Sequence, residues 1–393
     1  MSLPRVKVAD LSEQVRGVSY GKEDVSSTPK EGYVPILRAG NITDSGLTFD
    51  DLVFVPVERV SEKQIIRCYD VVIATSSGSL DIVGKAAPAL VDFTGSFGAF
   101  CKVLRPNSKV YPGYFAHFFK TRDYRRRISA LATSANINNL RNEHLDELEI
   151  LLPNWAEQKR IAEILDRAQS LISKRREAIA QLDTLTQAIF IEMFGDPVVN
   201  PKLHPVVRLG SLTKISSGST PSRKQPENFD GNIPWVKTTE VNGGLITDTE
   251  EKITESALQN SSCHVYPMGS ILIALYGQGK TRGQCAVLGI EAATNQACGV
   301  LLPNPNYITN FLFAQLSMSY SRLRAMARGG NQENLNLGLI ADFTVLLPSL
   351  PLQKEFARRI EALERLKTAH RASLSELDAL FASLQHRAFR GEL

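Results

Sequence analysis

The sequence predicts a mixed α/β (α+β) chain that uses one plan twice: a domain built on a curved mixed β-sheet, followed by a long helix. Motifs of the first half return in the second half in the same order. Two stretches carry the apolar spacing of long helices. The chain of 393 residues is also longer than one ordinary core requires. A duplicated, multidomain architecture is therefore expected.

The internal repeat is clearest where each copy ends. Ile150-Leu-Leu-Pro153 returns 195 residues later as Val345-Leu-Leu-Pro348. The starts of the copies also match, because Val6 to Leu11 parallels Val207 to Leu212. Two copies of one plan in a chain imply a pseudo-two-fold relation, the intramolecular form of a symmetric dimer. Further pairs at the same offset of 195 are Asn136 and Asn331, Asn139 and Asn334, Leu140 and Leu335, and Gln158 and Gln353.

These anchors divide the chain into five consecutive parts. Each globular part contains short apolar runs typical of strands, such as Val71 to Ala74 and Ser270 to Ala274, separated by Gly, Ser and Asn. The expected parts are a first domain at 1–153, a first helix at 154–196, a linker at 197–205, a second domain at 206–348 and a second helix at 349–393.

Each long helix is predicted from apolar residues that step alternately by three and four positions, as in the seam of a coiled coil. Gly195 and Asp196-Pro197 end the first helix. Neither helix can bury its own seam, so we expect the two to pack together, antiparallel if the duplication is pseudo-symmetric. One polar residue interrupts each seam, Arg175 in the first helix and His370 in the second. The expected seam residues are Ile161, Ile164, Ala168, Leu171, Arg175, Ala178, Leu182, Leu185 and Ile189, and Phe356, Ile360, Leu363, Leu366, His370, Leu374, Leu377, Leu380 and Leu384.

Cysteine usage and hydropathy indicate the compartment. The five cysteines are odd in number, widely spaced and without a Cys-x-x-Cys pair, which argues against a disulfide framework and a zinc site. No apolar run has the length of a membrane span, and the segment after Met1 does not resemble a secretion signal. A cytoplasmic protein without membrane attachment is expected.

Basic residues cluster locally although the net charge is only +4. Such clusters suit DNA phosphates, and amide side chains on loops suit base edges. A basic helix face is more often simply solvated, and loop amides more often serve turns, so both interpretations stay open for each residue. The DNA-binding candidates are Lys85, Arg122, Arg125, Arg126, Arg127, Arg223, Lys224, Gln278, Lys280, Arg282, Gln284, Arg322, Arg324 and Arg328.

One segment approximates a nucleotide-binding P-loop. Ala274 to Thr281 follows a strand and ends in Gly-Lys-Thr, but Ala274 replaces the first glycine. A second strand-like run follows, where a phosphate-binding loop requires a helix. No acid–base, nucleophile or metal constellation is recognisable elsewhere. We therefore expect a non-catalytic chain that binds neither cofactor nor metal.

The repeated motifs resemble those of the specificity subunits of type I restriction-modification systems. The resemblance rests on Asn331-Gln-Glu-Asn334-Leu335, then Leu346-Leu-Pro348, then Gln353-Lys354 at the start of a long helix, and on the same series in the first copy. Met193-Phe-Gly-Asp-Pro197, at the helix exit, is also similar to this family. Leu352 departs from the pattern, because Glu157 occupies the matching position of the first copy.

The resemblance implies two target recognition domains, each reading half of a bipartite, asymmetric DNA sequence, with the helices setting the spacing between the halves. It also implies two methyltransferase subunits docked on the helices, which bring S-adenosylmethionine, and nuclease-translocase subunits in the restriction complex. A coiled-coil scaffold unrelated to DNA and a nucleotide-binding protein using Lys280 are the competing functions.

Overall fold

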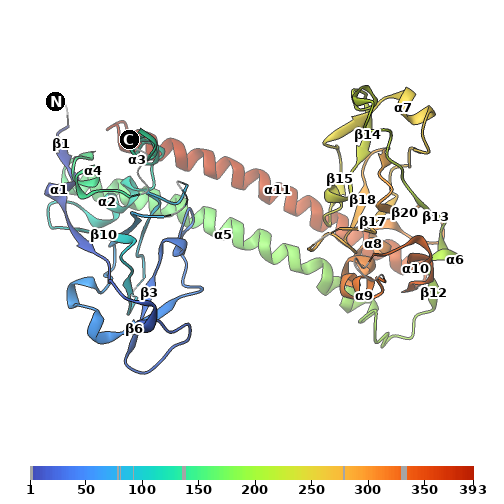
Figure 1. Cartoon of the computed structure of the whole chain (residues 1–393), viewed down its shortest axis with the longest axis horizontal. Helices are drawn as coiled ribbons and strands as arrows, with labels where there is room; N and C mark the ends of the chain where they lie inside the picture. The colour runs from blue at the N-terminus through green and yellow to red at the C-terminus, as the bar shows by residue number, and fades with distance from the viewer. Residues whose placement is uncertain are drawn as a thin grey trace. The chain divides into compact units, whose positions relative to one another are not determined.

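The structure is a computed structural model that describes residues 3–77, 79, 81–91, 93–134, 139–277, 279–328 and 334–393. The chain forms two units, Met1–Arg176 with Ala372–Leu393 and Glu177–Arg371 (Figure 1). Each unit holds one globular domain and segments of both long helices, α5 (Trp155–Phe194) and α11 (Leu350–Ala388). The observed helix bounds lie within the expected ranges 154–196 and 349–393.

The domain of the first unit contains an antiparallel four-stranded sheet and a smaller mixed sheet. The main sheet has the order β2 (Ser12–Arg16), β10 (Cys101–Pro106), β7 (Val71–Ala74), β8 (Ala86–Pro88). In the smaller sheet, β3 (Tyr33–Leu37) pairs antiparallel with β6 (Val53–Pro56) and parallel with β9 (Ser96–Phe97). The pair β1 (Arg5–Lys7) and β11 (Glu149–Leu151) joins the two ends of the domain.

The domain of the second unit repeats this topology. Its main sheet has the order β13 (Ile215–Ser217), β20 (Cys298–Leu301), β17 (Ile271–Ala274), β18 (Cys285–Leu288), with β15 (Leu245–Ile246) added in parallel. Its smaller sheet places β14 (Ile233–Val236) between β16 (Glu251–Ile253) and β19 (Ala293–Thr294) with the same mixed pairing. The pair β12 (Val206–Arg208) and β21 (Thr344–Leu346) closes the domain. The predicted mixed fold and internal repeat are confirmed.

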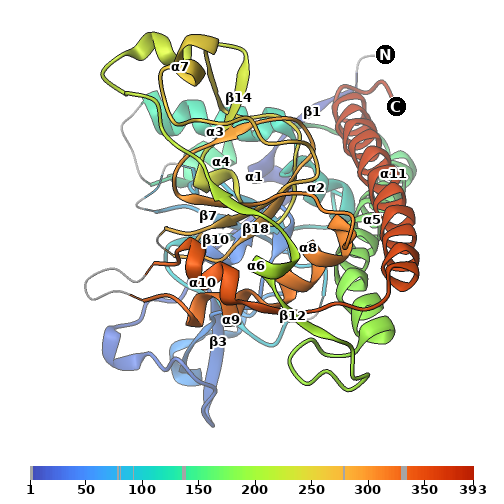
Figure 2. The same ribbon diagram turned by 90° about the vertical axis from the view of Figure 1, so that its right-hand side faces the viewer.

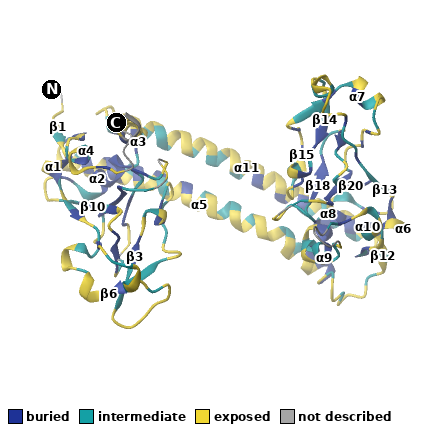
Figure 3. Cartoon of the chain, viewed as in Figure 1, coloured by how far each residue is buried: buried dark blue, intermediate teal, exposed yellow. Residues whose placement is uncertain are grey.

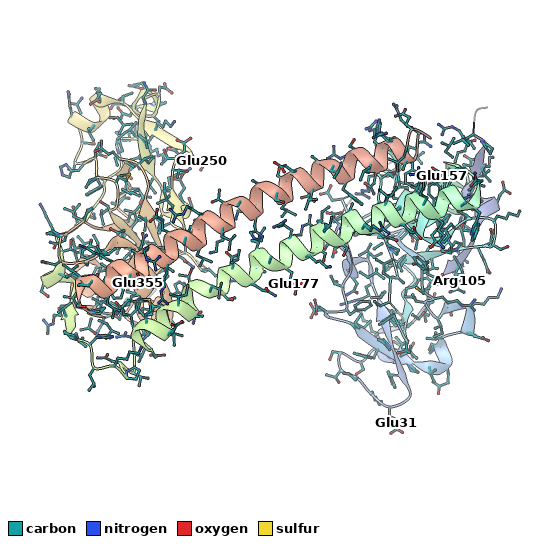
Figure 4. All side chains as sticks on the ribbon, turned by 180° about the vertical axis from the view of Figure 1, so that it is seen from behind. Glu31, Arg105, Glu157, Glu177, Glu250 and Glu355 are labelled. Carbon is teal, nitrogen blue, oxygen red and sulfur yellow. The ribbon has the colours of Figure 1, made fainter. Side chains whose placement is uncertain are left out.

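The first turn of each long helix contains an equivalent buried glutamine. Gln158 Nε2 donates to Pro153 O at 2.8 Å, and its Oε1 accepts from Tyr111 N at 2.8 Å. Gln353 makes the same two bonds, to Pro348 O at 2.8 Å and from Ile308 N at 2.9 Å. Because both side chains satisfy backbone groups that would otherwise be buried without a partner, the repeated Gln-Lys motif has a structural role. Figure 4 shows Glu157 and Glu355 near these two helix starts.

The two helices run antiparallel within each unit, as predicted. In the first unit Arg176 pairs with Asp378 at 3.2 Å. In the second unit Asp183 pairs with Lys367 at 3.1 Å, and Glu192 with Arg359 at 3.5 Å. Residue numbers rise along α5 as they fall along α11. Figure 2 shows the helices α5 and α11 side by side.

The expected seam is correct at every seventh position and only partly correct between them, where Ile360 is buried and Ile164 is half-buried. Ile161 and Ala168 are buried, and Leu182 and Ile189 are half-buried. Leu171 and Leu185, in contrast, are 54% and 40% exposed, and the buried stripe of the first unit passes through Leu165 and Ile172 instead. At 164–165 and 171–172 both positions are apolar, so spacing alone could not choose between them. In α11, Phe356 and Leu363 are buried, Leu377 and Leu384 are half-buried, and Leu366 and Leu380 are exposed.

The core of each domain is completed by both helices (Figure 3). In the first unit, Ile161 and Leu165 of α5 share a cluster with Leu384 and Phe389 from the end of the chain. In the second, Phe190 and Phe194 of α5 pack with Phe311 and Phe356, with ring centroids 4.8 to 6.3 Å apart. Within the described ranges, no helix combines the length and apolar character that crossing a membrane demands.

Candidate nucleic-acid interface

Each domain carries a loop that leaves the main sheet between equivalent strands, the β7–β8 loop (75–85) and the β17–β18 loop (275–284). Gly84 N donates to Ala74 O at 2.7 Å, and Gly283 N donates to Ala274 O at 2.8 Å, which closes both loops at their bases. The two glycines have φ angles of +78° and +83°, a region that side chains disfavour. The two loops are therefore structural equivalents.

The repeated Asn-Leu motif fixes the start of each loop. Leu140 N donates to Thr75 O at 2.7 Å, and Leu335 N donates to Leu275 O at 3.0 Å. Asn139 also forms a β-bridge with Ser76. A motif that marks the internal repeat in the sequence thus has a structural function in the loops. Asn136 and Asn331 lie outside the described residues.

In the first domain, Lys85 and Arg125 lie at the β7–β8 loop. Lys85 is half-buried and its Nζ lies 3.7 Å from Asp44. Arg125 donates from Nη1 to Val83 O at 2.8 Å and from Nη2 to Asp81 O at 3.0 Å. The guanidinium of Arg125 therefore holds the carbonyls of its own loop, and its role as a phosphate contact stays a prediction.

The remaining basic candidates of the first domain lie on α3 (Arg122–Ser134). Arg122, Arg126 and Arg127 are exposed and line a pocket of about 510 Å³. Arg5 and Arg390 line the same pocket, together with the acidic Asp123 and Glu149. Neither Arg5 nor Arg390 is predicted from the sequence, because they come from opposite ends of the chain and only the fold brings them together.

In the second domain, four candidates belong to the β17–β18 loop, and the structure describes three of them. Lys280 is exposed, and Arg282 and Gln284 are half-buried. Gln278 falls outside the described residues. Gly277 and Gly279 also have positive φ angles, of 139° and 59°. The loop leads directly into strand β18 and not into a helix. The P-loop-like sequence therefore lacks the helix N-terminus that would bind phosphates.

Arg322 and Arg324 belong to α9 (Tyr320–Ala325), and Arg328 follows it. Arg324 Nη1 donates to Gly279 O at 2.8 Å and to Arg282 O at 3.1 Å. Arg324 thus holds the β17–β18 loop as Arg125 holds the β7–β8 loop, and its role as a DNA contact stays a prediction. Arg322 lies 4.9 Å from the ring centroid of Phe343, whereas Arg328 is exposed.

Arg223 and Lys224 lie apart from the loop, next to the smaller sheet. Arg223 pairs with Glu251 at 2.8 Å and stacks 4.1 Å from the ring centroid of Phe229. Its guanidinium thus makes contacts within the domain, and its role as a DNA contact stays a prediction. Lys224 is exposed. The structure therefore groups Lys280, Arg282, Gln284 and Arg324, and separates Arg223 and Lys224 from them.

The described residues hold no cluster of metal ligands, and three of their five cysteines are buried thiols with a raised pKa. No three His, Cys, Asp or Glu side chains among them converge as metal ligands. Burial raises the pKa of Cys101, Cys285 and Cys298 to about 12, so these thiols stay protonated near neutrality and are weak nucleophiles. Arg105, labelled in Figure 4, forms an ion pair at 2.7 Å with the buried Asp70 and so ties strand β10 to the turn before β7.

Comparisons with known proteins match nearly the whole chain. The family model for the type I restriction modification DNA specificity domain matches twice, at residues 5–182 and 201–378. The EcoKI specificity subunit of Escherichia coli K12 is 31% identical, and the alignment covers 98% of this chain and 88% of that protein. The StySPI specificity subunit of Salmonella potsdam is 30% identical with the same coverage.

Solved structures share the fold. The S subunit of a type I system from M. genitalium has a TM-score of 0.60 at 17% identity, and the match covers 99% of this chain and 96% of that one. A chain from a type I restriction-modification complex has a TM-score of 0.63 at 18% identity, with full coverage of both. The two family matches coincide with the two domains of the same topology. This chain belongs to the type I restriction-modification DNA specificity subunits and carries two copies of the family's domain.

Proposed function

We propose that each domain of this DNA specificity subunit reads one half of a bipartite, asymmetric DNA sequence. The observation that carries the proposal is the pair of equivalent loops on one shared topology. Their frameworks agree, but their side chains differ: Ser76 and Ser77 follow the first strand, whereas Tyr276 and Gly277 follow the second. Equivalent frameworks with different loop side chains suit two different half-sites.

The long helices serve as spacer and docking surface for two methyltransferase subunits. In the first unit, Leu171 and Leu380 are exposed, and in the second, Leu185 and Leu366. In each pair, both leucines occupy the same heptad position of the two antiparallel helices. Exposed leucines at equivalent places of both repeats suit two copies of one partner. This chain contributes recognition, while the partners supply S-adenosylmethionine and the catalytic groups, with nuclease-translocase subunits in the restriction complex.

Mapping of methylated adenines tests the proposal. The chain is co-expressed with its methyltransferase in a host without other modification, and the genome is sequenced for modified bases. A gapped, asymmetric motif is expected. A chimaera that replaces residues 206–348 with the second domain of a relative should change one half of the motif only. A continuous motif, or a change in both halves, would contradict the proposal.

A further inference from the structure

The β7–β8 and β17–β18 loops are held by the same pair of side-chain types. In the first domain, the Tyr124 hydroxyl donates to Gly84 O at 2.9 Å, next to the two bonds from Arg125. In the second, the Tyr320 hydroxyl donates to Lys280 O at 2.8 Å, next to the bonds from Arg324. All these bonds end on backbone carbonyls of the loops, so they hold the loop path whatever its side chains are.

The arginine contacts are equivalent between the repeats. Arg125 bonds the carbonyl of Val83, which precedes Gly84, and Arg324 bonds the carbonyl of Arg282, which precedes Gly283. Both glycines have φ near +80° and close their loops through the bonds to Ala74 and Ala274. A guanidinium has enough donors to bond two carbonyls at once. Arg125 uses Nη1 and Nη2 for its two bonds, whereas Arg324 makes both from Nη1.

The opposite end of each loop is also fixed, by the backbone bonds from Leu140 to Thr75 and from Leu335 to Leu275. Between the fixed ends, several of the described side chains are polar or aromatic and reach the surface, whereas Val83 is buried. Ser79, Asp81, Tyr276 and Lys280 are exposed. A loop with both ends anchored and such groups between them presents donors and acceptors at defined positions, which the recognition of base edges requires.

We propose that Arg125 and Arg324 are positioning residues for half-site discrimination, each fixing the loop that reads the bases of its own half-site. The inference deepens the proposed function and rests on it. Neither arginine contacts DNA itself. Each acts through the carbonyls of its loop, so its removal releases the loop while every phosphate contact stays in place. The effect is therefore confined to sequence discrimination in one half-site.

The test uses the assembled complex of this chain with its methyltransferase and the motif found by methylation mapping. Binding is measured to three duplexes: the intact site, a site with a scrambled left half and one with a scrambled right half. Arg125→Gln should reduce discrimination at one half by on the order of tenfold and leave the other unchanged. Arg324→Gln should show the reverse pattern. Binding to random DNA and its salt dependence should not change.

Surface arginines with ion pairs provide matched controls. Arg59→Gln removes a pair with Asp24 at 3.0 Å, and Arg208→Gln removes a pair with Asp342 at 3.5 Å, and both should keep full discrimination. The conservative Arg125→Lys should recover only part of the discrimination, because an ammonium lacks the rigid fork of donors that a guanidinium has. If Arg125→Gln fails to fold, Tyr124→Phe removes a single loop bond and should weaken the same half-site.

Three results would overturn the inference. Full discrimination in both arginine variants, with the wild-type motif intact, would show that the loops need no anchor. Equal loss at both halves would indicate general destabilisation. A fall in affinity for random DNA with a shallower salt dependence would make these arginines phosphate contacts. The proposed function fails separately, if the wild-type chain shows no bipartite motif.

Discussion

Arginine has two roles within a few residues of the first domain. On helix α3, Arg125 turns toward loop carbonyls, whereas Arg122, Arg126 and Arg127 stay exposed at a pocket that Arg5 and Arg390 also line. The exposed group forms a local excess of positive charge suited to phosphates. Sequence reasoning places all four helix arginines in one class, because a basic run does not reveal which side chains find carbonyl partners in the fold.

Phosphate contact by the exposed group has a measurable consequence. Replacing Arg122, Arg126 and Arg127 by Gln should weaken binding to every DNA sequence alike. The slope of log affinity against log salt should become shallower by about one unit for each phosphate that the variant no longer binds. Filter binding of the assembled complex across a salt series measures both. An unchanged slope would show that this surface does not touch DNA.

A buried histidine makes the first unit sensitive to acid. His117, on α2 (Pro112–Phe118), lies with Nε2 2.8 Å from Asp166 Oδ1 of α5. Burial lowers the pKa of His117 below its ordinary 6.5, although Asp166 opposes the shift. The unfolded chain therefore takes up the proton more readily than the folded one, so the free energy of unfolding falls as pH drops through that range.

Urea unfolding at about pH 7.5 and about pH 5.5 tests this sensitivity. The wild-type chain should lose stability at the lower pH, and His117→Gln should lose less, because it has no proton to gain there. Comparing the two changes in stability removes the contribution of other titrating groups. Equal changes would mean that His117 is protonated as easily in the folded state as in the unfolded chain.

The helices show how far spacing predicts an element. Helix bounds, antiparallel pairing and the seam positions Ile161 and Phe356 follow from the sequence, because uninterrupted apolar steps and a glycine stop have few alternatives. The predicted seam is wrong at Leu171 and Leu185, which are exposed. Where two neighbouring positions are both apolar, as at 171–172, only the partner helix decides which one is buried. The exposed leucines of the two helices form the surface proposed for methyltransferase docking.

Changing these leucines should alter the composition of the complex. Leu171→Glu with Leu380→Glu should leave one bound methyltransferase in place of two, and Leu185→Glu with Leu366→Glu should do the same at the other unit, because buried glutamate loses its hydration. Native mass spectrometry counts the subunits. Glu177→Ala, an exposed change on the same helix, is the control. Two methyltransferases on a chain with all four changes would exclude this surface.

At the scale of the whole chain, the duplication is the most predictable feature and the loop contacts are the least. The repeated motifs indicate the backbone framework that both domains share. Gln158, Gln353 and the Asn-Leu segments satisfy buried backbone groups in both copies. The roles of Arg125 and Arg324 depend on carbonyls about 40 residues away in sequence. Such long-range partners have no local signature, so the sequence alone does not reveal that both arginines bond the carbonyls of a loop.

The spacer role predicts the effect of shortening both helices together. Removing 174–180 and 373–379 deletes one heptad from each and takes out both partners of the Arg176–Asp378 pair, so the seam stays in phase. Each helix shortens by about 10 Å, which corresponds to about three base pairs. Methylation mapping should find the same half-sites with a gap shorter by that amount. An unchanged gap would contradict the spacer role.

The packing of Leu384 and Phe389 against Ile161 and Leu165 has a consequence for biosynthesis. The amino-terminal domain needs these carboxy-terminal side chains to complete its interior, so it cannot mature while the ribosome is still translating the second half. Nascent chains stalled before residue 384 should expose that unfilled apolar site to chaperones and proteases. Once the last helix has left the ribosome, the strands of the first domain should become protected from hydrogen exchange, although they were translated more than 200 codons earlier.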